Sequence, residues 1–409
     1  MTFSNVAARA AQTTAASRCL TLPSGHSLVT LPDEGQDAFL TKKYDIGAYR
    51  DAFASMGLNP TEAWIAATVN YAGSEGWISY SRNNNSYSSA GIGTRTAILG
   101  AIEQLEGKGL IDNLPQIPHS PRPKKGTAQS IMRATTKMHE IFRTVVGNNR
   151  LPLIRPDPSI ILRNRQTKEP MLLLPTTELL EMERKVHACN EAIMSADLPH
   201  GAEACMRRIF SGGWDAGGRY YAEGASWQNM KSEARKEITI SGEPPVEIDF
   251  KAIHPSMLYI MSGLSVPSDC YAVPGWEKER DLVKYGLLIL INAKSKKEAL
   301  GAMQYKMLQG DREKENIRGD AIRIISDIER HHAPISHYFF RDFGITLQNF
   351  DSKIADRVLQ ILLNKGIVAL PVHDSFLVAR SHGRDLESAM LEAAAQCGFG
   401  DLRVEWKWT

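Results

Sequence analysis

Two aspartates, each beside a run typical of a buried strand, are the residues of this chain best suited to carry chemistry. Asp249 follows three strand-like residues, and Asp374 separates the two apolar runs of GIVALPVHDSFLV at 366–378. The second pattern is typical of a β-hairpin with the acid at its turn. If such strands are neighbours in one sheet, their carboxylates lie close together and repel each other unless divalent cations sit between them.

A pair of this kind suits Mg²⁺, which takes oxygen ligands and needs only one or two carboxylates when phosphates complete its shell. Two ions held in this way can activate a 3′-hydroxyl and stabilise a departing pyrophosphate. A single aspartate at a strand end is more typical of a turn or a cap, so the hypothesis depends on the pair.

A helix between the two acids presents cations on one face. In ERDLVKYGLLILINAKSKKEA, Arg280, Lys284, Leu288 and Asn292 follow one another at four-residue steps. An Arg and a Lys one turn apart can hold a triphosphate, and the apolar residue after them can pack against a base. Taken alone, the same pattern is more typical of a solvated helix face.

Four segments resemble motifs of the palm-domain nucleic acid polymerases. D-F-x-x-x-x-P-S at 249–256 is similar to motif A, most closely in its family B form, and R-x-x-x-K at 280–284 resembles motif B of family A and of single-subunit, phage-type RNA polymerases. VHDSF at 372–376 resembles motif C of those RNA polymerases, and WDAGGRYY at 214–221 contains their D-x-x-G-R element. The four occur in the order of that superfamily, and the resemblance covers roughly 200–380.

The resemblance implies a catalytic role for five residues. Asp249 and Asp374 would be the catalytic metal ligands, with the backbone carbonyl of Phe250 as a third, and would hold two Mg²⁺ or Mn²⁺ ions. Arg280 and Lys284 would hold the incoming triphosphate, and Lys284 would also protonate the leaving pyrophosphate.

The resemblance also implies contacts with nucleic acid. Asp215, Gly218 and Arg219 form the D-x-x-G-R element, which touches the template–product hybrid near the active site of such RNA polymerases. Gln348 lies in LQNFDS, a segment similar to one that family A uses near the primer–template minor groove. His373 would flank the catalytic turn near the primer end.

Two departures from the family bear on the choice of sugar. His254 stands where family B has Tyr, family A has Glu and phage-type RNA polymerases have Gly, and its imidazole would crowd a ribose 2′-hydroxyl. Asn292 stands where family A and the RNA polymerases carry a Tyr that helps to select the sugar. His254 favours deoxynucleotides, whereas the D-x-x-G-R and HDSF segments favour RNA synthesis, so both stay open.

The N-terminal half lies outside this resemblance and suggests a DNA-binding module. Apolar spacing predicts helices within 59–73 and 94–112, and the second leads into a Pro/Lys-rich segment, as in a winged helix-turn-helix. Residues of the recognition helix and wing would then meet DNA: Thr94, Arg95, Thr96, Lys124 and Lys125. A plain helical subdomain is the alternative.

Together these features predict an α+β protein. The expected architecture is a right-hand polymerase with an antiparallel-sheet palm and reduced fingers and thumb, preceded by a helical, winged helix-turn-helix-like domain. Four divisions are expected: a partly flexible lead-in (1–57), the winged-helix-like module (58–135), a linker with a thumb-like helical segment (136–200), and the palm and fingers (201–409).

Composition favours a cytoplasmic protein without a membrane segment. The chain is 43% hydrophobic and 23% charged, as in ordinary globular proteins, and has no run of about 18 apolar residues. Its five cysteines include no C-x-x-C pair, which argues against a zinc site or a disulfide framework and favours a reducing compartment.

The functional hypothesis is a template-directed nucleotidyltransferase of a phage, plasmid or other mobile element. It would extend a 3′-hydroxyl from nucleoside triphosphates on a DNA template, with a primer or product strand and replication proteins as further partners; de novo priming stays open. Two alternatives remain. One is a non-catalytic DNA-binding replication initiator or regulator, and the other is a two-metal nuclease that uses the same acids.

Overall fold

The computed structural model describes residues 19–20, 29–30, 44–71, 78–80, 94–114, 130–147, 151, 153–199, 202–223, 226–308 and 316–408. The chain divides into two compact units. Unit 1 comprises Met1–Arg155, Pro199–Cys205 and Ala222–Arg235, and unit 2 comprises Pro156–Leu198, Met206–Tyr221 and Lys236–Thr409. Both contain helices and sheets whose strands pair mostly antiparallel, so the expected α+β class is confirmed.

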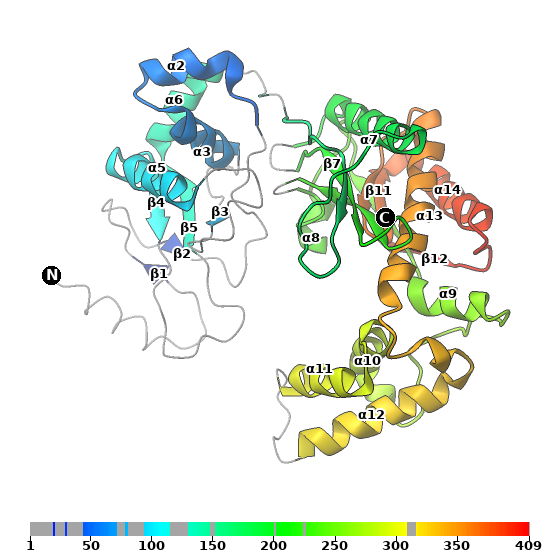
Figure 1. Ribbon diagram of the computed structural model, residues 1–409. Helices are drawn as coiled ribbons and strands as arrows, with labels where there is room; N and C mark the ends of the chain where they lie inside the picture. The colour runs from blue at the N-terminus through cyan, green and yellow to red at the C-terminus, as the bar shows by residue number, and fades with distance from the viewer. Residues whose placement is uncertain are drawn as a thin grey trace. The chain divides into compact units, whose positions relative to one another are not determined.

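Unit 1 combines helices with a small antiparallel sheet (Figure 1). Its helices are η1 (Gly47–Tyr49), α2 (Arg50–Ser55), α3 (Pro60–Tyr71), α5 (Arg95–Gly107) and α6 (Thr136–Val146). Its sheet has the order β3-β5-β4, with bounds Ile78–Tyr80, Ser130–Ala134 and Ile111–Leu114. A separate pair is formed by β1 (Cys19–Leu20) and β2 (Val29–Thr30).

Helix α3 begins as the sequence predicts. Oδ1 of Asn59 accepts hydrogen bonds from the N–H groups of Thr61 and Glu62 at 2.9 and 3.0 Å, and Oε2 of Glu62 accepts from the N–H of Asn59 at 3.0 Å. This reciprocal arrangement is a capping box, which satisfies donors that a helix start leaves without partners. The N-cap of α5 is Thr94, whose hydroxyl accepts from the N–H of Ala97.

The core of unit 1 is formed by the apolar faces of these helices and by the sheet. Ile98 and Ile102 of α5 pack in one buried cluster with Trp64 of α3, Met132 of β5 and Phe142 of α6. The polar start of α5 remains outside this core, as a solvent-facing helix end would.

The predicted DNA-contacting residues are only partly covered by the structure. Thr94 and Thr96 are exposed at the start of α5, and Arg95 is half-buried between them. Lys124 and Lys125 lie outside the described residues. The wing therefore stays a prediction.

Unit 2 is centred on a four-stranded antiparallel sheet of order β10-β11-β9-β12. Its strands are β9 (Pro245–Phe250), β10 (Leu370–Val372), β11 (Ser375–Ala379) and β12 (Val404–Trp408). Strands β10 and β11 form the hairpin that the sequence predicts, with the turn at 373–374. Helix α14 (Gly383–Gln396) packs on this sheet and on α13 (Gly344–Asn364) (Figure 1).

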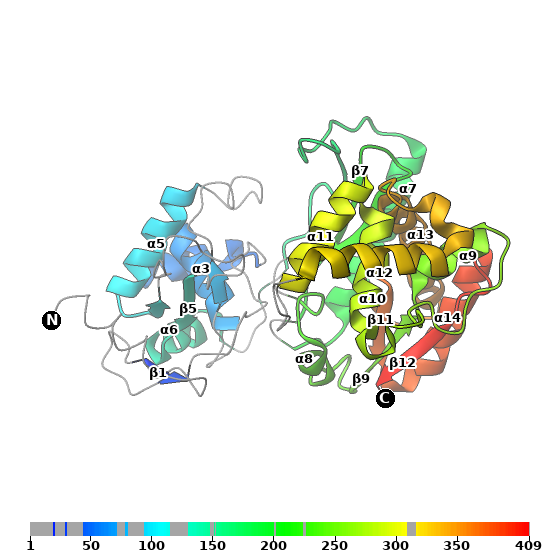
Figure 2. The same cartoon turned by 90° about the horizontal axis from the view of Figure 1, so that it is seen from below.

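Three helices form a lobe at one end of unit 2 (Figure 1), and they lie across the front of the unit when it is seen from below (Figure 2). They are α10 (Arg280–Asn292), α11 (Lys296–Leu308) and α12 (Ile317–His331). His332, directly after α12, is fully buried: its Nδ1 accepts from the hydroxyl of Tyr259 at 2.9 Å, and its Nε2–H donates to the carbonyl of Cys270 at 3.0 Å. Tyr259 belongs to α9 (Ile253–Met261), so His332 fixes the end of the lobe to the helix that follows β9.

A second sheet of unit 2 has the order β6-β7-β8. Its strands are β6 (Ile160–Arg163), β7 (Met206–Ser211) and β8 (Gly217–Ala222), and β6 runs parallel to β7. Helix α7 (Thr177–Ser195) has Thr176 as its N-cap, whose hydroxyl accepts a hydrogen bond from the N–H of Leu179. The segment 170–175 contributes a single bridge to this sheet, between Pro170 and Arg163.

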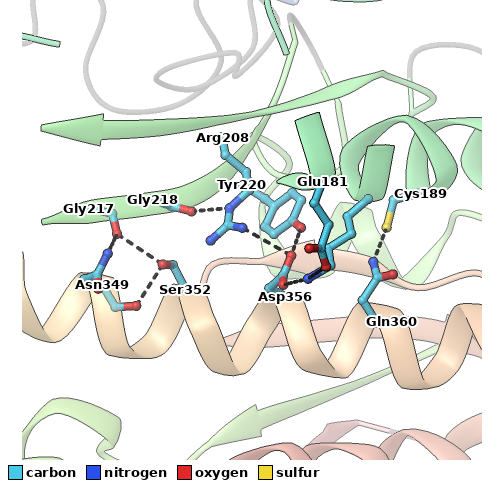
Figure 3. Close-up of polar contacts among 11 residues, drawn as sticks. Glu181, Cys189, Arg208, Gly217, Gly218, Tyr220, Asn349, Ser352, Asp356 and Gln360 are labelled. Carbon is cyan, nitrogen blue, oxygen red and sulfur yellow. Dashed lines mark hydrogen bonds and ion pairs between the residues drawn. The ribbon is translucent and has the colours of Figure 1, made fainter. Parts of the chain in front are cut away.

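A buried polar network joins α13 to this second sheet (Figure 3). Oδ1 of Asp356 accepts from the hydroxyl of Tyr220 at 2.5 Å and from Nη1 of Arg208 at 3.2 Å. Nε of Arg208 donates to the carbonyl of Gly218 at 2.9 Å. Because buried charges are stable only when they are paired, this network fixes the register of α13 along β8.

The remaining short elements are α8 (Ser232–Lys236), η2 (Glu277–Glu279), η4 (Ala333–Tyr338) and η5 (Arg380–His382). Within the described ranges, no helix is both long enough and apolar enough to cross a membrane.

Candidate active site

The central sheet of unit 2 brings the two predicted acids together. Asp249 of β9 is directly opposite Ser375 of β11, and Asp374 is the preceding residue, in the hairpin turn. The N–H of Phe250 donates to the carbonyl of Asp374 at 3.2 Å, which holds this turn against the end of β9. Both acids line the same cavity.

The electrostatics of this pair favour a positive charge beside it. Burial, followed by the nearby Asp374 carboxylate, raises the pKa of Asp249 to about 7, against the opposing charge of Lys407. Oδ1 of Asp249 is buried and has no hydrogen-bond partner. A buried carboxylate oxygen without a partner, beside a second carboxylate, is stabilised by a positive charge.

Lys407 supplies one such charge from the last strand. The register of β12 shifts between Trp406 and Trp408, so Lys407 is the extra residue of a bulge. Its Nζ lies 2.9 Å from Oε1 of Glu247 and 3.2 Å from Oδ2 of Asp249. Glu247 is fully buried, and the hydroxyl of Ser375 also donates to it. Lys407 therefore holds the carboxylates of β9 in place.

A cavity of about 530 Å³ opens beside the acids. The predicted face of α10 forms one wall, because Arg280, Lys284, Leu288 and Asn292 all line it. Its lining also includes other residues that the sequence singled out: Arg219, Phe250, His254 and Gln348. The volume is within the range of small-molecule sites, which is about 300–1,000 Å³.

Arg219 and His254 share a buried carboxylate that was not predicted. Arg219 forms a short ion pair with Asp351 of α13, and Nε of Arg219 also donates to Oδ1 of Asp351 at 3.0 Å. His254 Nε2 lies 2.8 Å from Oδ2 of Asp351. Because a carboxylate only accepts hydrogen bonds, Nε2 of His254 carries the proton. The imidazole is thereby fixed at the wall of the cavity.

The backbone conformation and the packing explain why residues 217 and 218, in the D-x-x-G-R segment, are both glycine. Gly217 and Gly218 both have positive φ, at 71° and 91°, where residues with a side chain are strained. A Cβ on Gly218 would lie 2.6 Å from the ring of Phe210 and 2.9 Å from the hydroxyl of Ser352. The close approach of β8 to α13 is also held by Asn349, which donates to the carbonyl of Gly217 at 3.1 Å (Figure 3). This contact places Arg219 opposite α13.

Other predicted residues are not on the cavity wall. Asp215 lies in the turn between β7 and β8. His373, with a positive φ of 61°, lies in the hairpin turn with its ring 6.0 Å from that of Tyr221, and burial lowers the pKa of this imidazole. Thr94, Arg95 and Thr96 belong to unit 1. The roles of these five residues stay predictions.

Several residues of the site were missed by the sequence analysis. Asp351 follows Gln348 in the LQNFDS segment, so its place in that segment was a signal. Asp269 pairs with Arg280, which lies 11 residues further along the chain. Lys407 pairs with Glu247, which lies 160 residues before it. No local pattern marks either of these pairs.

The acid pair fits a divalent cation by its chemistry. Two carboxylates and the carbonyl of Phe250 are hard oxygen donors, as Mg²⁺ and Mn²⁺ require, and Oδ1 of Asp249 is buried without a hydrogen bond. In the described part of the chain, no group of three or more His, Cys, Asp or Glu side chains is arranged around a metal position. A site with two protein carboxylates would therefore depend on substrate phosphates for its remaining oxygen ligands.

No protein-family model matches the chain, and no curated protein matches its sequence. Among solved structures, the chain is similar to the POL domain of Pol1 from M. smegmatis in complex with DNA primer–template and dNTP, at 13% identity and a TM-score of 0.30. The similarity covers 56% of this chain and 51% of that one, about half its length. A TM-score of this size does not define a common fold.

Proposed function

We propose that unit 2 is a template-directed nucleotidyltransferase that adds nucleotides from triphosphates to a 3′-hydroxyl. One observation supports this most strongly: a carboxylate of β9 and a carboxylate of the β10–β11 turn line a single cavity, and an Arg and a Lys one helical turn apart line the same cavity. The motif order of the sequence agrees with this arrangement. In such a polymerase, the β10-β11-β9-β12 sheet would be the palm, and helices α10 to α12 would be the fingers.

Each side of the cavity has a distinct task in this proposal. Asp249 and Asp374, with the carbonyl of Phe250, would hold two Mg²⁺ or Mn²⁺ ions. Such ions, when bound, lower the pKa of a hydroxyl and neutralise developing charge on phosphate oxygens. Arg280 and Lys284 bind the triphosphate, and Lys284 donates a proton to the pyrophosphate as it leaves.

In this proposal, the sugar of the nucleotide binds beside His254, which selects between ribose and deoxyribose. Its imidazole lines the cavity and is held by Asp351, so it cannot turn away freely from a ribose 2′-hydroxyl. Deoxynucleotides are therefore the favoured substrate. Asn292, one turn beyond Leu288 on α10, lines the same cavity and would contact the base or sugar.

We further propose that unit 1 delivers DNA to this site. The exposed first turn of α5 carries Thr94 and Thr96, as a recognition helix requires. A small polymerase joined to its own DNA-binding module suits the replication or priming of a phage, plasmid or other mobile element. Replication proteins would then be its partners.

The test is extension of a labelled DNA primer by the purified full chain. A 5′-labelled primer–template is incubated with Mg²⁺ or Mn²⁺ and with dNTPs or NTPs in separate reactions. Template-dependent lengthening supports the proposal, and omission of the template detects untemplated transfer. Shortening of the primer would identify a nuclease, and an unchanged primer in all reactions would leave only DNA association.

A further inference from the structure

The loop before α10 places a carboxylate against the predicted phosphate-binding arginine. Oδ2 of Asp269 accepts from Nε of Arg280 at 2.9 Å, and Oδ1 accepts from Nη2 at 3.0 Å. This is the two-pronged geometry in which a guanidinium also binds a phosphate. The Arg280 guanidinium in turn holds the pKa of Asp269 below its usual range, so this carboxylate is charged at neutral pH.

The same loop supports both cations of α10 with an aromatic ring. The guanidinium of Arg280 lies 5.0 Å from the ring centroid of Tyr271, and Nζ of Lys284 lies 5.8 Å from it. Oδ1 of Asp269 also accepts from the N–H of Tyr271 at 2.9 Å, which fixes the carboxylate relative to the ring. Asp269, Tyr271, Arg280 and Lys284 all line the cavity.

The pair is accessible enough to exchange partners. The side chains of Arg280 and Asp269 are 47% and 32% exposed. Ion pairs of this exposure contribute little net stability, so a triphosphate can displace the carboxylate from the guanidinium. A negative charge left at Asp269, which lines the same cavity, then repels the phosphates bound at Arg280.

We propose that Asp269 is a resident anion that competes with the phosphates of the nucleotide for Arg280 and so limits the affinity of this site for triphosphates. The inference deepens the proposed function, because it rests on the assignment of Arg280 and Lys284 as triphosphate ligands. Tyr271 keeps both cations in place while the anion on Arg280 changes from carboxylate to phosphate.

The test measures binding of inorganic tripolyphosphate to the full chain by titration calorimetry. Asp269→Asn removes the charge but keeps an oxygen that can accept from the N–H of Tyr271. Loss of an exposed ion pair and of one repulsive charge should tighten binding about two- to tenfold. Asp269→Ser serves as a second variant, and circular dichroism verifies that both variants are folded.

Two control variants test whether the effect is specific to Asp269 and whether it depends on Arg280. Asp281→Asn removes an equal charge from the residue next to Arg280, and Asp281 does not line the cavity. This control should change the affinity less than twofold. Arg280→Gln should weaken binding, and adding Asp269→Asn to it should give a smaller gain than in the wild type, from the loss of repulsion alone. Equal or weaker binding by folded Asp269→Asn, or the same gain in the Arg280→Gln background, would overturn the inference.

The result separates this inference from the proposed polymerase activity. If Asp269→Asn binds tripolyphosphate more tightly but the chain extends no primer, the anion competition stands and the polymerase proposal fails. If the wild type extends primers but Asp269→Asn shows neither tighter binding nor a lower KM for the nucleotide, the competition fails alone. With both correct, KM falls in Asp269→Asn while kcat is unchanged, a split that a merely structural role would not produce.

Discussion

His254 and Asp351, 97 residues apart in the sequence, meet at the wall of the cavity through a hydrogen bond of 2.8 Å from Nε2–H to Oδ2. Asp351 is almost completely buried and is also paired with Arg219. The imidazole that would meet the sugar of a nucleotide is therefore oriented by a charged partner that cannot move into solvent. Sugar selection should then depend on Asp351 as well as on His254.

Asp351→Asn should lower the preference for dNTP over NTP by about tenfold, the effect of roughly 1.4 kcal/mol between competing substrates. His254→Gly should lower it at least as much, because the imidazole itself is removed. If Asp351 acts through His254, the double variant should be no less selective than His254→Gly alone. Single-nucleotide extension assays give these ratios, and an additive loss in the double variant would contradict the coupling.

Lys407→Met should destabilise the protein by about 3 kcal/mol, because it leaves the fully buried Glu247 without its cation. Adding Glu247→Gln should restore much of this loss, since the side chain of the fully buried residue 247 then carries no charge. Urea unfolding measures both effects. The exposed pair Lys365–Asp385 has the same 2.9 Å separation, so Lys365→Met is a matched control that should cost less than about 1 kcal/mol. Equal losses for the two lysines would contradict the role given to burial.

Gly218→Ala should destabilise the protein by about 2–4 kcal/mol through overpacking and backbone strain. The added methyl group would meet both Phe210 and Ser352, at a φ of 91°. Gly242→Ala is the matched control, because its φ is 83° but nothing lies within 4 Å of the added Cβ. It should cost only about 1 kcal/mol. Similar thermal unfolding midpoints for the two variants would show that the contact with α13 is not tight.

The buried His332 should make stability depend on pH. Burial lowers its pKa from 6.5 to about 4, so between these values the unfolded chain binds a proton that the folded protein does not. Stability is therefore fully present above pH 6.5 and declines as the pH falls toward 4, by up to about 3 kcal/mol. The difference in unfolding free energy between the wild type and His332→Gln should shrink in this window. A difference independent of pH would contradict this assignment.

Local patterns in the sequence were enough to predict the elements that carry the site. The strand patterns around Asp249 and Asp374, and the four-residue spacing that begins at Arg280, depend on neighbours along the chain, and the structure has the hairpin and the helix face accordingly. The partners of these residues could not be predicted, because they depend on tertiary contacts. Lys407 reaches Asp249 through a bulge in a distant strand, and Asp269 meets Arg280 from a loop without a regular pattern.

Features that depend on neighbouring residues differ in the same way from features that depend on packing. The helix starts at Asn59 and Thr176 depend on capping residues, and a cap involves only the next three residues along the chain. The wing expected at Lys124 and Lys125 lies outside the described residues and stays a prediction. Which segments share a core is decided by packing, which no short window of sequence contains.

Primer extension by acid-to-amide variants tests the central claim most directly. Asp249→Asn and Asp374→Asn should each reduce the rate of single-nucleotide addition by about a thousandfold or more, because either change removes a ligand from one shared cation site. The double variant should be little worse than either single one. Asp385→Asn, which removes an exposed acid of α14, should extend the primer like the wild type. Full activity in either single variant, or strictly multiplicative losses in the double variant, would contradict a single site formed by these two acids.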